Sequence, residues 1–192
     1  MTEIILATNN ANKVREIKAI LGGRFEIKTL AQAGIEIDVE ETGTTFAENA
    51  YIKAYEVAKL TGKPALSDDS GLEVEALGGA PGIYSARYAG KEQNDKANIK
   101  KLLSVMEGEQ NRKARFVSSV CLCYPDGSFV SAEGEVKGEI LLEERGTNGF
   151  GYDPVFFCYE LGKSLGKAES AEKNLVSHRK RALENLAAKL GV

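Results

Sequence analysis

The sequence of 192 residues has little of several residue types on which common catalytic sites depend. It contains one histidine, His178, which excludes a histidine-rich metal centre, an H-E-x-x-H helix and a histidine dyad. A Ser-His-Asp triad would have to use this histidine, and no G-x-S-x-G segment accompanies it. Any bound metal is therefore expected to have oxygen ligands, which favours Mg²⁺ or Mn²⁺.

Cysteine and long apolar runs are also scarce. Cys121, Cys123 and Cys158 form no C-x-x-C pair, and we interpret them as buried thiols in a reducing compartment rather than a zinc site. No apolar run approaches 18 residues, and the first residues, MTEIILATNN, show neither a basic segment nor an A-x-A cleavage site. We therefore expect a cytoplasmic protein with no membrane partner.

Positive charge is not in excess, with 25 Lys and Arg against 28 Asp and Glu and a net charge of −3. No overall positive field is present to attract a nucleic-acid backbone, so no nucleic-acid partner is expected. A small anionic ligand needs only a few local cations and stays possible. The hydrophobic content of 43% is ordinary for a soluble globular protein, and the length suits one sizeable domain or two lobes that share a core.

Strand and helix patterns alternate along the whole chain and predict an α/β fold around a mixed central sheet flanked by helices. The predicted strands are residues 3–8, 25–30, 65–66, 72–74, 115–124 and 129–136, the last two as a hairpin. The predicted helices are residues 11–21, 45–60, 94–106 and 178–190. Thr45 and Glu48 form a capping box, and Ser177 can cap the last helix. Residues 78–90 and 147–154 should be ordered glycine-rich loops, the first anchored by Ile83, Tyr84 and Tyr88.

Two acidic segments are candidates for a cation site. Asp68 and Asp69 follow an apolar strand, where adjacent carboxylates repel each other unless a cation or hydrogen bonds compensate. In a strand they would point to opposite faces, and an ordinary Asx turn explains the segment equally well. Glu40 and Glu41 lie in a second acidic loop, which alone is a solvated turn. Together with Asp69 it could hold a hard divalent cation that bridges phosphate oxygens.

Residues 8–13 join the first strand to the first helix and are candidates for phosphate binding. Unpaired N–H groups and the positive end of the dipole make a helix N-terminus a natural phosphate site, and Lys13 adds charge. The segment is not a Walker A loop, because G-x-x-x-x-G-K-[ST] occurs nowhere. A simple capped helix start is equally compatible.

Residues 148–154 and the region around the last helix are candidates for base recognition. Glycines on both sides of Phe150 would let its ring lie flat against a planar ligand, and Asp153 could accept hydrogen bonds from a base or ribose. A hydrophobic plug in a surface loop is the simpler interpretation. Lys173, His178 and Arg179 could donate to a purine O6 or to phosphates, although such a basic run is usually a solvated helix face.

The order of these segments closely resembles the inosine triphosphate pyrophosphatase family, whose bacterial members are dITP/XTP pyrophosphatases. The resemblance runs from residue 4 to the C-terminal helix. It is carried by T-x-N-x-x-K at 8–13, E-x-G-x-T-F at 41–46, E-N-A at 48–50, S-D-D-S-G-L at 67–72, L-G-G-A-P-G-I-Y-S-A-R-Y at 77–88, N-G-F-G-Y-D-P at 148–154 and E-K-N-x-x-S-H-R at 172–179. Asn9 stands where many relatives carry glycine, and Leu66-Ser67 replaces a commoner alanine, but neither change removes a charged group.

The resemblance implies a homodimer of subunits with two lobes and an active-site cleft between them, each subunit a single catalytic domain over residues 1–192. By matched position, Asp69 is expected to be the general base and a metal ligand, Glu41 the other metal carboxylate and Asp68 a supporting carboxylate. The expected triphosphate-binding residues are Thr8, Asn9, Asn10, Ala11, Asn12, Lys13, Lys53 and Ser70. The expected base-binding residues are Phe150, Gly151, Tyr152 and Asp153 for stacking and orientation, and Lys173, His178 and Arg179 for the 6-keto group.

The implied activity is Mg²⁺-dependent hydrolysis of dITP, ITP and XTP to the monophosphate and pyrophosphate, which would cleanse the nucleotide pool. Water polarised by Asp69 and Mg²⁺ would attack the α-phosphorus, and donors placed for a 6-keto oxygen would discriminate against adenine. Three alternatives remain: a pyrophosphatase for modified pyrimidines like the Maf-like proteins, a nucleotide-sensing module without turnover, and a haloacid-dehalogenase-like phosphatase. The acidic pair with Glu41 argues against a pure binder, and the missing D-x-D-x-[TV] spacing argues against the phosphatase.

Overall fold

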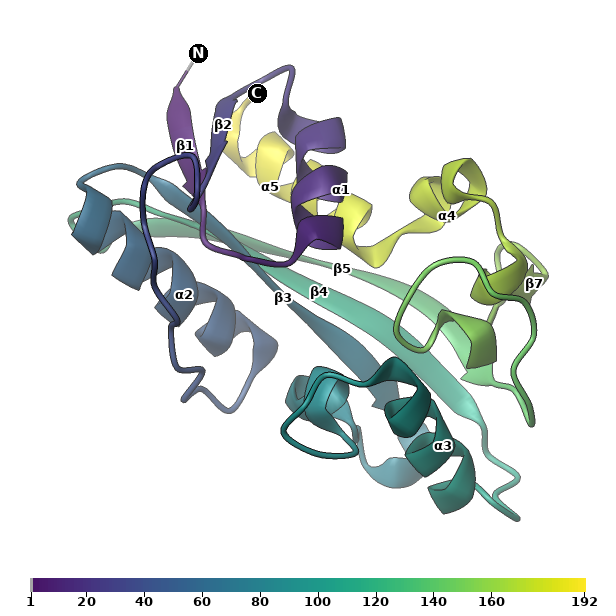
Figure 1. The fold of residues 1–192 in the computed structure, drawn as a ribbon. Coiled ribbons are helices and arrows are strands. Elements are labelled where there is room, and N and C mark those ends of the chain that lie inside the picture. The colour runs from purple at the N-terminus through teal and green to yellow at the C-terminus, as the bar shows by residue number, and fades with distance from the viewer. Residues whose placement is uncertain (1) are drawn as a thin grey trace. The chain divides into compact units, whose positions relative to one another are not determined.

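The computed structural model describes residues 2–192 and confirms the predicted α/β class (Figure 1). Within these residues, seven strands form one mixed sheet in the order β2-β1-β3-β4-β5-β6-β7. β1 pairs in parallel with β2 and β3, whereas β6 pairs antiparallel with β5 and β7. The strands are β1 Glu3–Leu6, β2 Glu26–Thr29, β3 Ala65–Val74, β4 Lys113–Cys123, β5 Phe129–Ile140, β6 Phe156–Cys158 and β7 Lys163–Ser164.

The four predicted helices are present, and one short helix was not predicted. The α-helices are α1 Ala11–Leu21, α2 Phe46–Thr61, α3 Asp95–Val105, α4 Ser170–Val176 and α5 His178–Leu190. Short 3-10 helices are η1 Glu75–Leu77, η2 Gly82–Arg87, η3 Asp153–Val155 and η4 Leu165–Lys167. No helix in the described part of the chain combines the length and the apolarity that a membrane crossing requires.

The ends of the helices follow the predicted capping chemistry, with one difference. The Thr45 hydroxyl accepts the N–H of Glu48 at 3.1 Å, as a capping box requires. The Glu48 carboxylate, however, accepts the N–H of Thr44 at 2.7 Å and its hydroxyl at 2.9 Å. α2 ends at Gly62, whose φ of 66° is left-handed.

The largest correction to the sequence prediction concerns β3. We expected two short strands separated by Ser67-Asp68-Asp69-Ser70-Gly71, but the strand runs without a break from Ala65 to Val74. Adjacent residues of a strand point to opposite faces, so Asp68 and Asp69 face different surroundings. The Asx-turn interpretation is therefore wrong.

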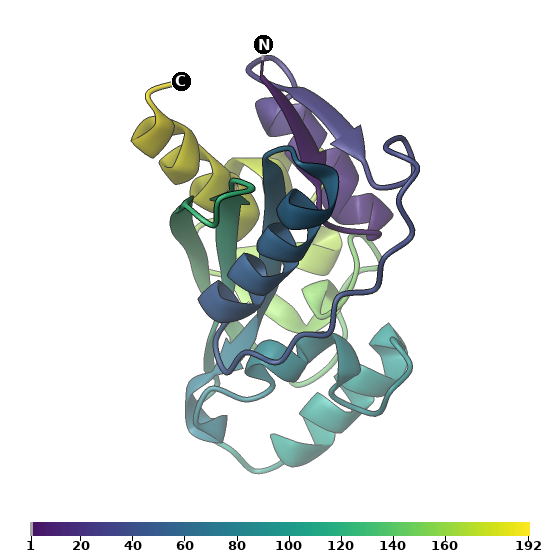
Figure 2. The same cartoon turned by 90° about the vertical axis from the view of Figure 1, so that its left-hand side faces the viewer.

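One compact unit consists of the segment that ends at Ser70 together with Ser118–Gly134 and Arg179–Val192. Alternate residues of β1 face different layers: Ile4 and Leu6 pack with α1 and α5, whereas Ile5 packs with α2. Figures 1 and 2 show α2 on one side of these strands and α1 with α5 on the other. Cys121 and Cys123 share one face, as predicted, and both are buried free thiols against α2.

The second compact unit consists of Gly71–Val117 and Glu135–His178. Its core contains side chains from β3, α3, β4, β5 and β6 together with Tyr152 and Leu165. In the glycine-rich segment of residues 78–90, Tyr88 packs against this core as predicted. Tyr84 is 61% exposed and does not anchor the segment. The active-site cleft and the assignment of residues 1–192 to one domain stay predictions.

Candidate active site

The N-terminus of α1 is held by its own residues. The Asn10 side chain caps the helix by accepting the N–H groups of Asn12 at 3.0 Å and Lys13 at 3.2 Å. The Thr8 hydroxyl accepts the N–H of Asn10 at 3.1 Å. This arrangement confirms the capped helix start, and a phosphate at this position would share or replace these contacts. The Lys13 side chain points to β3, where its Nζ lies 2.6 Å from Asp68 Oδ1.

Asp68 is the centre of a buried charge cluster. Its side chain is fully buried and accepts from Lys13, from Ser118 Oγ at 2.5 Å and from Arg179 Nε at 3.3 Å. Burial alone would raise the pKa of this carboxyl, but Arg179 and Lys13 together hold it well below its usual range. The ion pairs thus favour the anionic form of Asp68, which fits the role of a supporting carboxylate.

Arg179, which was also predicted for base recognition, lies in this cluster. Its guanidinium is 2% exposed, donates from Nη2 to Ser70 Oγ at 3.1 Å and forms an ion pair with Glu16. The pKa of Arg179 is raised, because the attraction of Asp68 and Glu16 outweighs the effect of burial. These contacts support a role in ordering Asp68 and Ser70.

Asp69, on the opposite face of β3, is held by a lysine of α2. Lys53 Nζ lies 3.2 Å from Asp69 Oδ1 and 2.6 Å from Glu41 Oε1, and donates to the main-chain oxygen of Asp68 at 3.0 Å. The pKa of Lys53 is raised, because Asp69 and Glu41 outweigh the effect of burial. Glu41 and Asp69 thus both contact the Lys53 ammonium. Glu41 Oε1 and Asp69 Oδ1 are therefore no farther apart than the sum of their two distances to Lys53 Nζ.

The second oxygen of Asp69 has no such partner. Asp69 Oδ2 is buried and accepts no hydrogen bond from the described residues. Burial raises the pKa of this carboxyl despite the attraction of Lys53, and Glu41 adds to the rise. A buried carboxylate with an unsatisfied oxygen and a raised pKa has the properties of a group that binds a cation or removes a proton.

In the second unit, three of the predicted base-recognition residues touch each other. Asp153 Oδ2 accepts the N–H of Phe150 at 2.9 Å and the Lys173 ammonium at 2.5 Å. Lys173 Nζ also lies 4.3 Å from the centre of the Phe150 ring. The carboxylate therefore fixes both the ring and the cation beside it. His178 is buried and stacks on Phe116, with ring centres 5.2 Å apart.

The Tyr152 side chain is held differently from its neighbours. Its ring is buried in the core, and its hydroxyl donates to the main-chain oxygen of Ser85 at 2.6 Å. Burial raises the pKa of this phenol. Tyr152 anchors the loop, and the partly exposed Phe150 is left as the aromatic side chain available for stacking.

Comparison with known proteins decides the family. The chain matches the Ham1 family over residues 4–189. It is 51% identical to a dITP/XTP pyrophosphatase of Bacillus licheniformis, over 99% of this chain and 98% of the relative, and 46% identical to that of Bacillus subtilis, over 97% and 96%. The chain belongs to the Ham1 family. The resemblance indicated by the motifs is thereby confirmed.

Solved structures of the Ham1 family support the fold as well. The Ham1 protein of Staphylococcus aureus superposes with a TM-score of 0.91 at 42% identity, and the match covers 98% of both chains. That of Coxiella burnetii superposes with a TM-score of 0.92 at 41% identity, covering 100% of this chain and 99% of the other. The mixed seven-strand sheet is therefore the fold of these relatives.

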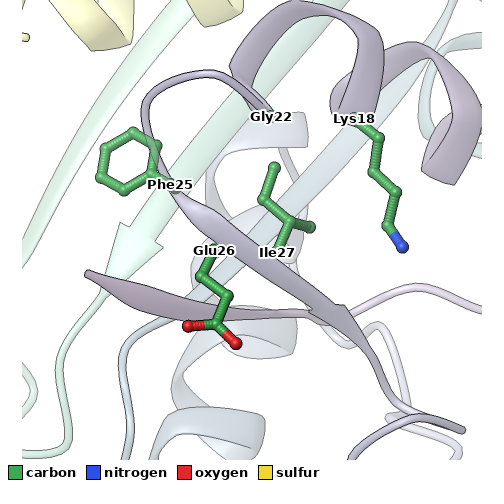
Figure 3. A pocket seen from close by; sticks show the side chains of 5 residues that line it. All are labelled: Lys18, Gly22, Phe25, Glu26 and Ile27. Atoms are coloured by element: carbon green, nitrogen blue, oxygen red, sulfur yellow. The ribbon is translucent and has the colours of Figure 1, made fainter. Parts of the chain in front are cut away.

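A hollow in the first unit is lined by none of the predicted site residues. It is lined by residues of α1 and the start of β2, namely Lys18, Gly22, Phe25, Glu26 and Ile27 (Figure 3). Its one lysine and one glutamate provide no constellation for phosphate or metal chemistry. Among residues 2–192, no group of three His, Cys, Asp or Glu side chains is arranged to hold a metal. A cation at Glu41 and Asp69 would need oxygen ligands from water or substrate as well.

Proposed function

We propose that this Ham1-family protein hydrolyses dITP, ITP and XTP to the monophosphate and pyrophosphate, and so removes these nucleotides before they enter DNA or RNA. The observation that carries the proposal is the proximity of Glu41 and Asp69. They come from separate parts of the sequence, and both form ion pairs with the ammonium of Lys53. The names of the relatives, dITP/XTP pyrophosphatase, support the choice of substrate.

The residues fit a hard divalent cation, which we propose to be Mg²⁺. Glu41 and Asp69 supply two carboxylates, the Asp69 Oδ2 atom is buried and without a partner, and Lys53 already places positive charge between them. Carboxylate oxygens are the ligands that Mg²⁺ prefers, and such a site keeps several water or phosphate ligands. When bound, the ion would neutralise phosphate charge and lower the pKa of water.

Asp69 is proposed as the general base. A raised pKa makes it a stronger base than an exposed aspartate. It would accept a proton from water while the water oxygen forms a bond to the α-phosphorus. The bond between this phosphorus and the bridging oxygen would break, and pyrophosphate would leave with the electron pair. Lys13 and Lys53 would then stabilise the negative charge on the leaving group.

The triphosphate and the base are assigned to different residues. Thr8 to Lys13, Lys53 and Ser70 are proposed for the phosphates. Phe150 is proposed to stack on the purine, with Gly151, Tyr152 and Asp153 orienting it. Lys173, His178 and Arg179 are proposed as donors to its 6-keto oxygen. An adenine amino group would leave such donors unpaired, which can lower kcat/KM for the adenine nucleotide by orders of magnitude.

The test is product analysis with dITP, XTP, dATP, dGTP and dUTP, each with Mg²⁺ and with a chelator. We expect pyrophosphate from dITP and XTP with Mg²⁺ and little from the other nucleotides. Orthophosphate as the product would contradict attack at the α-phosphorus. A preference for dUTP would favour the pyrimidine enzyme, and tight binding of dITP without any product would favour the sensing module.

We also propose a homodimer, as implied by the family resemblance. Sedimentation equilibrium at micromolar concentration would measure the mass, and the chain mass of 20.7 kDa gives the monomer reference. A mass that stays at the monomer value would contradict this proposal and leave the proposed activity untouched.

A further inference from the structure

We propose that Asp95, at the start of α3, is a positioning residue that fixes the loop carrying Phe150. Asp95 Oδ2 accepts the main-chain N–H of Gly151 at 2.8 Å. The two residues are separated by 56 positions in the sequence, so the contact joins distant segments of the second unit. The inference rests on the proposed function only where it assigns the Phe150 ring to the base.

Two consecutive main-chain N–H groups of the loop are held by two carboxylates. Asp153 accepts the N–H of Phe150, and Asp95 accepts the N–H of the next residue, Gly151. Asp153 belongs to the loop itself and also binds Lys173, whereas Asp95 comes from a regular helix. Asp95 thus anchors the loop to a helix that lies outside the loop's own stretch of sequence.

The helix that carries Asp95 is well anchored. Asn94 caps α3 by accepting the N–H of Ala97, and Ile99 and Leu102 are buried in the core. The buried Asn98 accepts the N–H of Ala89 at 2.7 Å and donates to the main-chain oxygen of Ala86 at 3.0 Å. The position of the Asp95 carboxylate is therefore set by the core and by residues 86–89.

The loop would otherwise be poorly restrained next to the aromatic ring. Gly151 has a φ of 58°, in the left-handed region, and no side chain to pack. On the other side of the loop, Tyr152 is anchored to Ser85 through its hydroxyl. With Asp95 present, the Phe150–Gly151 peptide and the following residue, Tyr152, are both tied to the same scaffold of α3 and residues 82–89. This gives the sequence motif at 77–88 a function: it supports the base-binding loop.

Asp95 itself is exposed, so its replacement leaves the core intact. The informative comparison is Asp95→Ala with Asp95→Asn. Both variants remove the negative charge at the helix N-terminus, and with it the same interaction with the helix dipole. Only asparagine keeps an oxygen that can accept the Gly151 N–H. A matched control is Asp126→Ala, since Asp126 is an aspartate that accepts the N–H of Ser128 in the hairpin turn.

Loop order can be measured without substrate because the chain has no tryptophan. In a Phe150→Trp background, the single indole reports on the loop through acrylamide quenching and fluorescence anisotropy. We expect Asp95→Ala to raise quenching and lower anisotropy, and Asp95→Asn and Asp126→Ala to change neither. Unchanged fluorescence in Asp95→Ala would overturn the inference, whatever the protein hydrolyses.

The kinetic test uses the chain with native Phe150 and dITP as substrate. We expect Asp95→Ala to raise KM about fivefold with little change in kcat, the loss expected for one hydrogen bond that orders a binding loop. Asp95→Asn should restore KM. A changed fluorescence signal with an unchanged KM, or a loss confined to kcat, would contradict the positioning role. Absence of turnover in the unmodified chain would instead reject the proposed function, and the fluorescence result would still decide whether Asp95 holds the loop.

Discussion

At the scale of single residues, Asp68 and Asp69 show how neighbouring side chains of one type acquire opposite properties. Both are buried in the same strand, and their side chains point to opposite faces. Asp68 meets two cations and the Ser118 hydroxyl, which together outweigh burial and lower its pKa, whereas burial raises the pKa of Asp69, which meets one shared ammonium. The first is suited to a fixed structural anion and the second to proton transfer.

Asp69→Asn is expected to reduce pyrophosphate release from dITP at least about 100-fold, because general-base catalysis contributes roughly that factor or more. The substitution should not lower the stability of the folded state. Burial raises the pKa of Asp69, so the folded chain holds this proton to a higher pH than the unfolded chain does. As pH rises from the unfolded to the folded pKa, ionisation favours unfolding. At pH 8 the variant should therefore have a thermal midpoint equal to or above that of the parent.

The measurements are product release and a thermal melt for Asp69→Asn, with Asp126→Asn in the hairpin turn as the control. The control should retain both rate and midpoint. Near-normal turnover by Asp69→Asn would remove this residue from the proposed role, and a much lower midpoint would show that the lost rate reflects misfolding.

The residue scale also shows what the sequence could not reveal. The motifs assign Arg179 to the base together with Lys173 and His178, and this assignment stays a prediction. The structure adds ion pairs of its guanidinium with Asp68 and Glu16, which the motifs do not indicate. Asp95 carries no local signal, because its contact with Gly151 depends on the packing of distant segments. Conversely, the pairing of Glu41 with Asp69 was expected on the motifs and is present, whereas the roles assigned to these residues remain proposals.

At the scale of elements, the helices were predictable and β3 was not. α1 has the predicted bounds because Val14, Ile17 and Leu21 recur at helical spacing and all pack in one cluster. The composition Ser-Asp-Asp-Ser-Gly favours a turn locally. Tertiary ion pairs with Lys13, Lys53 and Arg179 stabilise it as a buried strand instead. α4, β6 and β7 are too short to produce a clear period, since none exceeds seven residues.

Asp68 links three elements, so its removal should affect the fold more than the loss of Asp69 would. Its carboxylate joins β3 to Lys13 of α1 and to Arg179 of α5. Asp68→Ala leaves the buried Arg179 and the partly buried Lys13 without this carboxylate. We expect a loss of about 3 kcal/mol in the free energy of unfolding, measured with urea. Ser118→Ala, which removes one neutral donor to Asp68, should cost only about 1 kcal/mol.

Asp68→Ala should also change how the free energy of unfolding depends on pH. Because the folded pKa of Asp68 lies below the unfolded value, its contribution is present above the unfolded pKa of about 4 and is lost as pH falls towards the folded pKa. The parent should lose stability across that acidic window, and Asp68→Ala should lose less. Equal slopes in both proteins would contradict the ion-pair interpretation.

Two glycines of the loop at residues 148–154, which is proposed to bind the base, allow a paired test of its geometry. A Cβ on Gly149 would lie 2.0 Å from Asp153 Oδ2, whereas a Cβ on Gly151 would meet no atom within 4 Å. Both have positive φ, 77° and 58°, so alanine strains the backbone at either site. Only Gly149→Ala should also displace Asp153 and Lys173. We expect a larger rise in KM for dITP in Gly149→Ala than in Gly151→Ala, and equal values would show that Asp153 does not set the loop.

At the scale of the whole molecule, we expect folding not to depend on a metal. Each compact unit has its own apolar core, and one lysine, Lys53, already offsets part of the charge of the two carboxylates of the proposed cation site. A chelator should therefore abolish turnover of dITP and leave the thermal midpoint within the error of the melt. Restoring excess Mg²⁺ should restore the rate. A large drop in the midpoint on chelation would indicate a structural metal instead.

The ammonium of Lys53 is in effect an intrinsic counter-ion. Without it, the buried Asp69 and the partly exposed Glu41 would together repel the polyanion that the site is proposed to admit, and the barrier would grow as ionic strength falls. One ammonium against two carboxylates still leaves one net negative charge before any inorganic ion arrives. The lysine therefore reduces this repulsion without removing it, and a divalent cation is still needed to make the site attractive to a triphosphate.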